Sequence, residues 1–347
     1  MNLDDRKSRI LYAIVRDYVQ TTRPVGSERL IEAYGIGCKS ATVRNEMSEL
    51  SELGYIVQPH TSAGRIPTDL GYRYYVDTLM PPSTPEPEVD RLGEDLHHKP
   101  WDELDAILNQ TCRILASLTS YLSIATNPIT ETTCLHRVYV SQATARHMLL
   151  VVVLSTGHVE HRLIEGDTLP SEAQLSQITN YLNGVVGDRE LTELGRILAT
   201  LETPNEMQQH TPAIGRVVAA LIQVVSNSRE QGKIYMEGSN QILRQPEFHD
   251  MERLELLFTA LEEKRHFYEV LRHAWSEHRV TVIIGTENSY APMQSCSLIT
   301  SLYHIGGRPA GVLGVVGPTR MNYDHATVTV ARMAGHLSQA LTALSQA

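Results

Sequence analysis

The N-terminal part of the chain carries the pattern that most limits its fold. Apolar residues recur at three- and four-residue steps over residues 5–20, which predicts an amphipathic helix. Two shorter helices are expected at 27–33 and 41–53, with Ser27 and Ser40 as their N-caps. A glycine-containing turn joins these two helices, so together they form the pattern of a helix-turn-helix.

A strand–loop–strand pattern follows the third helix. Tyr55–Val57 favours a strand, Pro59–Gly64 a loop and Arg65–Ile66 a short return strand. A further helix is expected after this hairpin. Three helices followed by a hairpin are the order of a winged helix-turn-helix, so we predict a DNA-binding domain of this class over residues 1–79.

The charge distribution agrees with such a head. The whole chain has a formal net charge of −10, which would oppose binding to phosphates. Residues 1–79, however, hold ten basic and ten acidic side chains, so the rest of the chain carries the whole excess of negative charge. A neutral head can turn one basic face toward DNA while an acidic body stays away from it.

The third helix presents polar side chains where a recognition helix contacts bases. A step of about 100° per residue places Val43, Met47 and Leu50 on the face toward the core of the head. Arginine can bind guanine and asparagine can bind adenine through paired hydrogen bonds, while serine and threonine are adaptable donors. The predicted DNA-contacting residues of this helix and its N-terminal flank are Lys39, Ser40, Thr42, Arg44, Asn45 and Ser48.

The loop of the hairpin has the composition that close approach to DNA requires. It combines small residues, hydroxyls and a cation, and we expect His60, Thr61, Ser62 and Arg65 to lie along the backbone or the minor groove. Two alternatives remain open on the pattern alone. Such a surface is often only solvated, and some winged helices bind proteins instead of DNA.

The remainder of the chain predicts an α+β multidomain protein. Residues 80–93 are rich in proline and acids, which indicates an extended linker that separates the head from the rest. Beyond a helix expected to reach about Leu122, strand patterns within 94–184 and 279–347 flank a largely helical block at 185–278. We predict one α+β domain built from the two outer segments, with the mostly helical block inserted into it.

The helical block contains an apolar stripe that is too wide for the surface of a monomer. We expect this stripe to form the interface of a homodimer. The alternative is that it packs as the local core of the block. Its residues are Ile214, Val217, Val218, Leu221, Ile222 and Val225.

Other chemistry finds little support in the sequence. The cysteines are scattered without a CxxC pair, so neither a disulfide framework nor a metal site is expected. No glycine-rich nucleotide loop is present, and Cys296 and His304 lack an orienting acid, so we expect no catalytic residues and no cofactor. The apolar runs are too short to span a membrane and the N-terminus has no apolar signal core, so a cytoplasmic protein without a membrane partner is expected.

Three contiguous blocks resemble one known family. Ser40–Asp77 (SATVRNEMSELSELGYIVQPHTSAGRIPTDLGYRYYVD), Gly232–Phe248 (GKIYMEGSNQILRQPEF) and Val315–Ala326 (VVGPTRMNYDHA) are similar to the HrcA repressor family. The blocks occur in the family's order and extend over nearly the whole chain.

The resemblance implies more than the pattern does. It implies a winged-helix head, a GAF-like domain and a dimerisation module inserted into that domain. It further implies a homodimer that represses class I heat-shock operons (groE and dnaK) by binding a double-stranded inverted-repeat operator, CIRCE, with activity modulated by the chaperonin GroEL. The main alternative is a winged-helix regulator gated by a metabolite in the GAF-like domain. An enzyme with an attached DNA-binding head is the third possibility, and the missing nucleotide loop argues against it.

Overall fold

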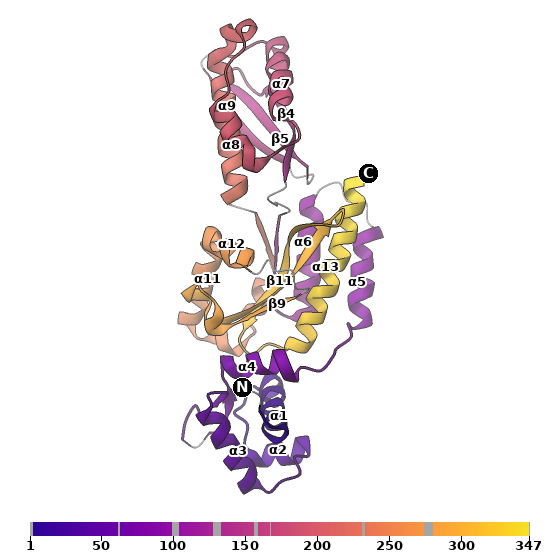
Figure 1. The fold of residues 1–347 in the computed structure, drawn as a ribbon, viewed down its shortest axis with the longest axis vertical. Coiled ribbons are helices and arrows are strands. Elements are labelled where there is room, and N and C mark those ends of the chain that lie inside the picture. The colour runs from indigo at the N-terminus through magenta and orange to yellow at the C-terminus, as the bar shows by residue number, and fades with distance from the viewer. Residues whose placement is uncertain are drawn as a thin grey trace.

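The computed structural model is an elongated α+β protein of three units (Figure 1). We call them the head (residues 3–79), the body (80–127 and 233–346) and the outer unit (133–230). The body lies in the middle, with the head at one end and the outer unit at the other. The structure describes residues 3–61, 63–98, 104–127, 133–155, 159–166, 168–230, 233–273 and 280–346.

The head contains the helices and the hairpin that the sequence predicts. Ile10, Leu11 and Ile14 of the first helix are fully buried, and they share one core with Val43 and Leu50 of the third. This packing of amphipathic faces holds the short helices in place. The elements are α1 (Asp5–Thr21), α2 (Ser27–Tyr34), α3 (Ser40–Glu52), β1 (Ile56–Val57), β2 (Ile66–Pro67), α4 (Asp69–Tyr74) and a π-helical turn (Tyr75–Leu79).

The predicted N-caps of α2 and α3 are wrong by one residue. Gly26 and Lys39 occupy the cap positions, and neither makes a side-chain capping hydrogen bond. Ser27 and Ser40 are instead the first helical residues, and their hydroxyl oxygens lie 2.9 Å apart. The two serines therefore tie the starts of α2 and α3 together.

The body is built on a five-stranded antiparallel sheet with the order β8-β3-β11-β10-β9. One face packs against α6 and α13, which α5 covers from outside, and the other face packs against α10, α11 and α12. The strands are β3 (Leu122–Thr126), β8 (Ile234–Glu237), β9 (Thr281–Ile284), β10 (Cys296–Ile305) and β11 (Arg308–Pro318). The helices are α5 (Pro87–His98), α6 (Leu104–Thr119), α10 (Ser239–Ile242), α11 (Met251–Glu262), α12 (Lys264–His273) and α13 (Tyr323–Gln346).

Sequence analysis missed the strand β3. Helix was expected to about Leu122, whereas α6 ends at Thr119 and the strand begins at Leu122. All five residues of β3 are buried, with Leu122 and Ile124 on one face of the sheet and Ala125 on the other. A strand buried on both faces has no alternation of apolar and polar residues, which removes the signal.

The outer unit has a sheet of its own, with the order β6-β5-β4-β7. Its three helices cover one face of that sheet and share one apolar core with it. At the start of the first of these helices, the backbone N–H of the N-cap Ser171 donates to Gln174 Oε1 at 2.8 Å. The elements are β4 (Cys134–Gln142), β5 (His147–Leu154), β6 (Val159–Glu165), α7 (Glu172–Val186), β7 (Arg189–Glu190), α8 (Leu191–Ala199) and α9 (Thr211–Glu230).

The predicted domain boundaries need correction. Residues 134–165 were assigned to the same domain as 279–347, but they pair only with one another and with β7. Conversely, 234–273 were assigned to the insertion, although β8 pairs with β3 and the helices after it pack on the body's sheet. The insertion is thus a mixed α+β unit and begins about fifty residues before position 185.

The apolar stripe of α9 lies inside the outer unit. Ile214, Val217, Leu221 and Val225 are buried in the core that α9 shares with β4, β5 and α7. The prediction that this stripe is a dimer interface is therefore wrong for these residues. In the structure these residues belong to a local core, which was the alternative interpretation.

The predicted linker is shorter than residues 80–93. Pro87 begins α5, and Val89 is fully buried against the body. The remaining stretch runs from Met80 to Glu86. The head also contacts the body directly, so the linker does not hold the two apart.

Candidate nucleic-acid interface

Helix α3 exposes the side that the sequence assigned to DNA. Lys39, Arg44, Asn45 and Ser48 are exposed, while Val43, Met47 and Leu50 are buried. Ser40 and Thr42 are half-buried at the start of the helix. Most of the predicted contact residues of α3 thus share one accessible side, as a recognition helix requires.

Arg44 is held over the start of α2. Its Nε donates a hydrogen bond of 3.1 Å to Ser27 Oγ, and its guanidinium lies 3.7 Å from Glu28. The Ser48 hydroxyl donates to the carbonyl oxygen of Arg44 at 3.0 Å. The exposed Arg44–Glu28 pair is weak, because water screens it, and a phosphate or a base can therefore replace it.

Two of the three acids of α3 are paired with cations of α1. Glu46 is buried, accepts from Arg6 at 3.1 Å and forms an ion pair of 3.0 Å with Lys7, which also pairs with Glu49 at 2.9 Å. Hydrogen bonds to Asp4, Glu49 and Glu46 raise the pKa of Lys7 above its ordinary value. The negative charge of α3 is therefore compensated beside the helix, which lowers its repulsion of phosphates.

The hairpin loop is braced by backbone contacts. The Gln58 side-chain amide donates to the carbonyl oxygens of Thr61 and Ala63, both at 2.9 Å. Val25 and Arg65 exchange two backbone hydrogen bonds of 2.9 Å, which join the loop to the segment before α2. A Cβ at position 64 would lie 2.4 Å from the Val25 carbonyl oxygen, so glycine is required there.

The predicted loop residues differ in accessibility. His60 and Thr61 are exposed, and Arg65 is half-buried. Ser62 lies outside the described residues. Accessible hydrogen-bond donors therefore lie both on α3 and in the loop, although they do not form one unbroken row.

A groove of about 490 Å³ lies between α2, α3 and the loop. Of the predicted residues, the groove brings together Arg44, Ser48 and Arg65. Ser27 and Gln58 also line it, and sequence analysis did not select either of them. The groove has two guanidinium groups, several neutral donors and one carboxylate, that of Glu28. The two cations and the donors suit the oxygens of a nucleic-acid backbone.

Comparison with known proteins identifies the family. The family description "HrcA protein C terminal domain" matches residues 105–327. A heat-inducible transcription repressor HrcA of Desulforamulus reducens is 36% identical over 341 residues, which cover 98% of each chain. The chain belongs to the HrcA family. Another HrcA repressor, from Pelotomaculum thermopropionicum, is 37% identical over 98% of this chain and 97% of that protein.

One solved structure shares the fold of this chain over its whole length. It is a crystal structure of a hypothetical protein at 2.2 Å resolution, with a TM-score of 0.61 and 23% sequence identity over 99% of both chains. Among the residues that the structure describes, no three His, Cys, Asp or Glu side chains gather as a metal site would require. No helix of the described part of the chain is long and apolar enough to cross a membrane.

Proposed function

We propose that this HrcA-family chain is a transcriptional repressor whose head is a winged helix-turn-helix. In this proposal α3 is the recognition helix and the hairpin β1–β2 is the wing. The observation that carries it is the exposed polar side of α3 beside the groove, with Arg44 and Arg65 at its two walls. The relatives' printed name, heat-inducible transcription repressor, supports the same function and argues for a regulator that works on DNA in the cytoplasm.

We assign Lys39, Ser40, Thr42, Arg44 and Asn45 to DNA from α3 and its flank. The N-terminal half of a recognition helix enters the major groove, which suits the place of these residues. The remaining proposed contacts to bases and to the backbone come from Ser48, His60, Thr61, Ser62 and Arg65.

The body is proposed to be a GAF-like scaffold. Tyr303 is fully buried inside the body, and its hydroxyl donates to the carbonyl oxygen of Thr126 at 2.6 Å. A Cβ at position 311 would lie 2.4 Å from that hydroxyl, so Gly311 lets the ring fill the space. Close packing of this kind favours a scaffold over a metabolite pocket.

A homodimer is proposed to form through the outer unit. The face of its sheet away from the helices exposes Tyr139, Val159 and Leu163, with Leu149 and Val151 half-buried between them. The strand register brings Leu149 opposite Leu163 and Val151 opposite Tyr139. We call these five residues the outer sheet face. His161 lies on the same face, opposite Val151, and the apolar group around it suits an isologous contact with a second copy.

The operator is proposed to be the inverted repeat CIRCE of the groE and dnaK operons. A dimer with two heads explains why two half-sites are needed. The chaperonin GroEL is proposed to favour the active dimer, so that repression ends when heat-damaged proteins occupy the chaperonin. If added GroEL leaves operator occupancy unchanged during mild heating, the chaperonin part of the proposal is wrong.

Variants of α3 test the DNA-binding role. Arg44→Gln and Asn45→Ala are each expected to weaken binding by about 1–3 kcal/mol per half-site, which is about 5- to 150-fold in affinity for a single half-site and more for the repeat. Glu52→Gln changes an exposed residue at the far end of the helix and is the matched control. Equal affinity of all four proteins for the repeat at one salt concentration would contradict the assignment of α3 as the recognition helix.

A further inference from the structure

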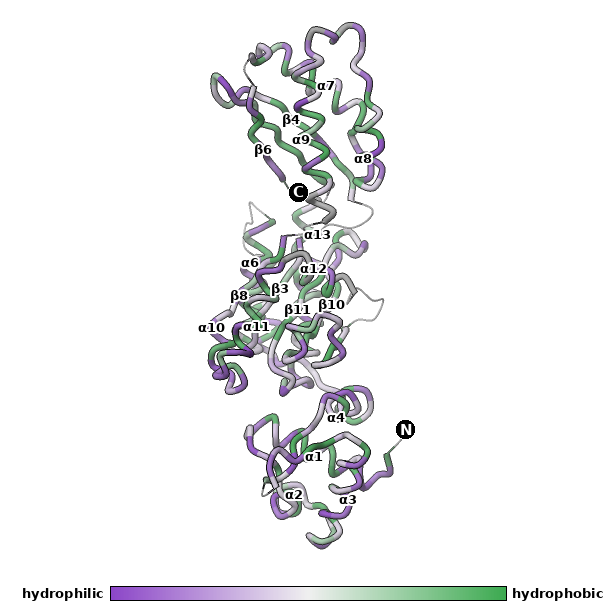
Figure 2. Tube along the Cα trace, turned by 90° about the vertical axis from the view of Figure 1, so that its left-hand side faces the viewer, coloured by the Kyte–Doolittle hydropathy of each residue, from purple (hydrophilic) through white to green (hydrophobic). Residues whose placement is uncertain are grey.

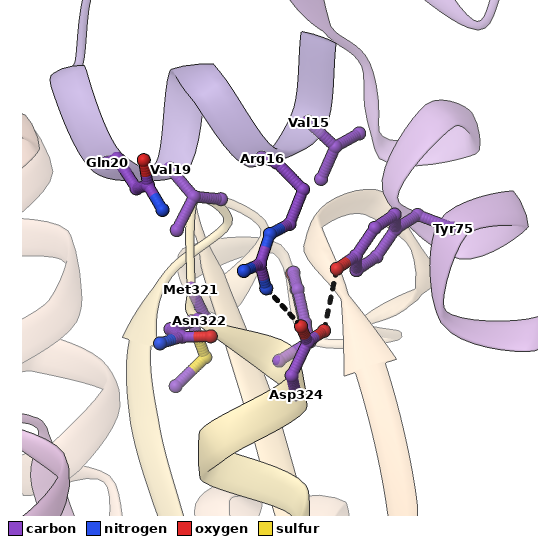
Figure 3. Close-up of a pocket in the computed structure, with 9 residues that line it drawn as sticks. Val15, Arg16, Val19, Gln20, Tyr75, Met321, Asn322 and Asp324 are labelled. Atoms are coloured by element: carbon purple, nitrogen blue, oxygen red, sulfur yellow. Dashed lines mark hydrogen bonds and ion pairs between the residues drawn. The ribbon is translucent and has the colours of Figure 1, made fainter. Parts of the chain in front are cut away.

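The head is fixed to the body by a buried carboxylate. Asp324, in the first turn of α13, accepts from Arg16 of α1 through one oxygen. Its other oxygen accepts from the hydroxyl of Tyr75 at 2.7 Å (Figure 3). The Asp324 side chain is 9% exposed, so it is largely withdrawn from water between the two units. A carboxylate in such a position needs both partners to offset its desolvation.

Further polar contacts join the same surfaces. Arg73 donates to Glu287 Oε1 at 2.7 Å and to the carbonyl oxygen of Val282 at 2.6 Å. Arg320 of the body donates to the carbonyl oxygen of Val19 at 2.8 Å. The contacts lie on α1, α4 and the segment before α13, so they restrain the head at several separate points.

An aromatic centre lies beside these polar contacts. Tyr72 of the head and Tyr323 of the body are both buried, with ring centroids 5.7 Å apart. Buried residues of α1 and α4 share one continuous apolar core with residues of α13. Apolar packing combined with directional hydrogen bonds defines one orientation of the head, which a flexible tether alone would not.

Helix α1 links this contact to the recognition helix. Near its N-terminus, Arg6 and Lys7 hold Glu46 of α3, and near its C-terminus Arg16 holds Asp324. A helix transmits position well, because its backbone hydrogen bonds keep it straight over this length. The direction of α3 is therefore set relative to the body.

We propose that the Arg16–Asp324–Tyr75 contact is a positioning contact that determines which half-site spacing the dimer accepts. The inference rests on the proposed DNA-binding function. One added base pair rotates a half-site by about 34–36° and moves it by about 3.4 Å. Heads held in one orientation bind both half-sites at one spacing, whereas released heads follow the DNA and tolerate several.

Asp324→Asn and Arg16→Gln test this proposal in the full-length protein. Each removes the ion pair, and the amide introduced by Asp324→Asn would keep an oxygen that can accept from Tyr75. Arg16→Lys keeps the charge and is the conservative variant. Arg113→Gln is the matched control, because it removes the exposed 3.1 Å pair with Glu237 on the body.

Affinity is measured for the half-site and for repeats whose spacer is varied one base pair at a time. For the wild-type protein, Arg16→Lys and Arg113→Gln, we expect the affinity to fall at least about tenfold when the spacer differs by one base pair from the best length. For Asp324→Asn and Arg16→Gln, we expect the affinity to vary by less than about threefold across the series of spacers. Their half-site affinity should stay at the wild-type value, since α3 itself is unchanged.

Each outcome has one meaning. If the two charge-removing variants keep the wild-type spacing profile, the positioning role is overturned. If a variant does not fold, the remaining variant of the pair and Arg16→Lys still give the comparison. If the wild-type protein binds neither the half-site nor the repeat more tightly than a scrambled duplex, the proposed DNA-binding function itself is wrong. Half-site affinity therefore tests the DNA-binding function, whereas the spacing profile tests the positioning contact.

Discussion

Replacement of Leu163 by glutamate is expected to separate the dimer without unfolding the subunit. Leu163 is 64% exposed on the outer sheet face. Figure 2 shows that hydrophobic residues are frequent along the strands of the outer unit. Full burial of a leucine side chain is worth about 1.5–3 kcal/mol, so burial of the exposed part is worth about 1–2 kcal/mol. An isologous interface buries two copies, and the variant therefore costs about 2–4 kcal/mol, or about 30- to 700-fold in the dissociation constant.

The assay is sedimentation velocity over a range of protein concentrations, with thermal unfolding measured on the same samples. Met251→Glu is the matched control, because Met251 is an apolar residue that is 72% exposed on α11 of the body. The control should dimerise as the wild type does. The reasoning would be refuted if Leu163→Glu dimerised with the wild-type constant while remaining folded.

Three further predictions follow from buried positions. Leu221→Ala should destabilise the outer unit by about 2–5 kcal/mol in denaturant unfolding but leave the folded protein dimeric. If the dimer of this variant dissociated before the subunits unfolded, α9 would be part of the dimer interface after all. Gly64→Ala should push against the carbonyl of Val25 and destabilise the head by about 1–3 kcal/mol, visible as faster amide exchange there, whereas unchanged exchange would contradict the close approach. Burial raises the pKa of Cys112 to about 12 and of Cys296 to about 11, so these thiols lose their protons at lower pH in the unfolded chain than in the folded one. The melting temperature should therefore fall as pH rises above the ordinary thiol pKa of 9.0. Alkylation of both thiols in the native protein at pH 8 would contradict their burial.

Local patterns in the sequence predict the head well, because each helix there has a clear apolar period. The same reasoning fails where partners are distant in the chain. The apolar run of β5 predicts a strand but does not show which sheet that strand joins, so the insertion boundary was misplaced. The linker was predicted too long because proline suggests extended chain, although Pro87 occupies a first helical position where proline is well tolerated.

The same limit applies to the candidate site, of which the sequence predicts only the part that local helical geometry determines. The exposed side of α3 follows from helical geometry alone, so Arg44, Asn45 and Ser48 could be selected from the sequence. The groove depends on the Val25–Arg65 bridge and on Gln58, which braces the loop. Contacts between residues that are far apart in the chain, or between a side chain and a backbone carbonyl, leave no periodic signal.

The most direct test of the account is a binding titration of the full-length protein against three duplexes at one fixed salt concentration. The duplexes carry the complete inverted repeat, a single half-site and a scrambled sequence. The account predicts tight binding to the repeat, much weaker binding to the half-site and the weakest binding to the scrambled duplex, because two heads act together and α3 contacts bases. Equal and weak binding to all three would contradict it.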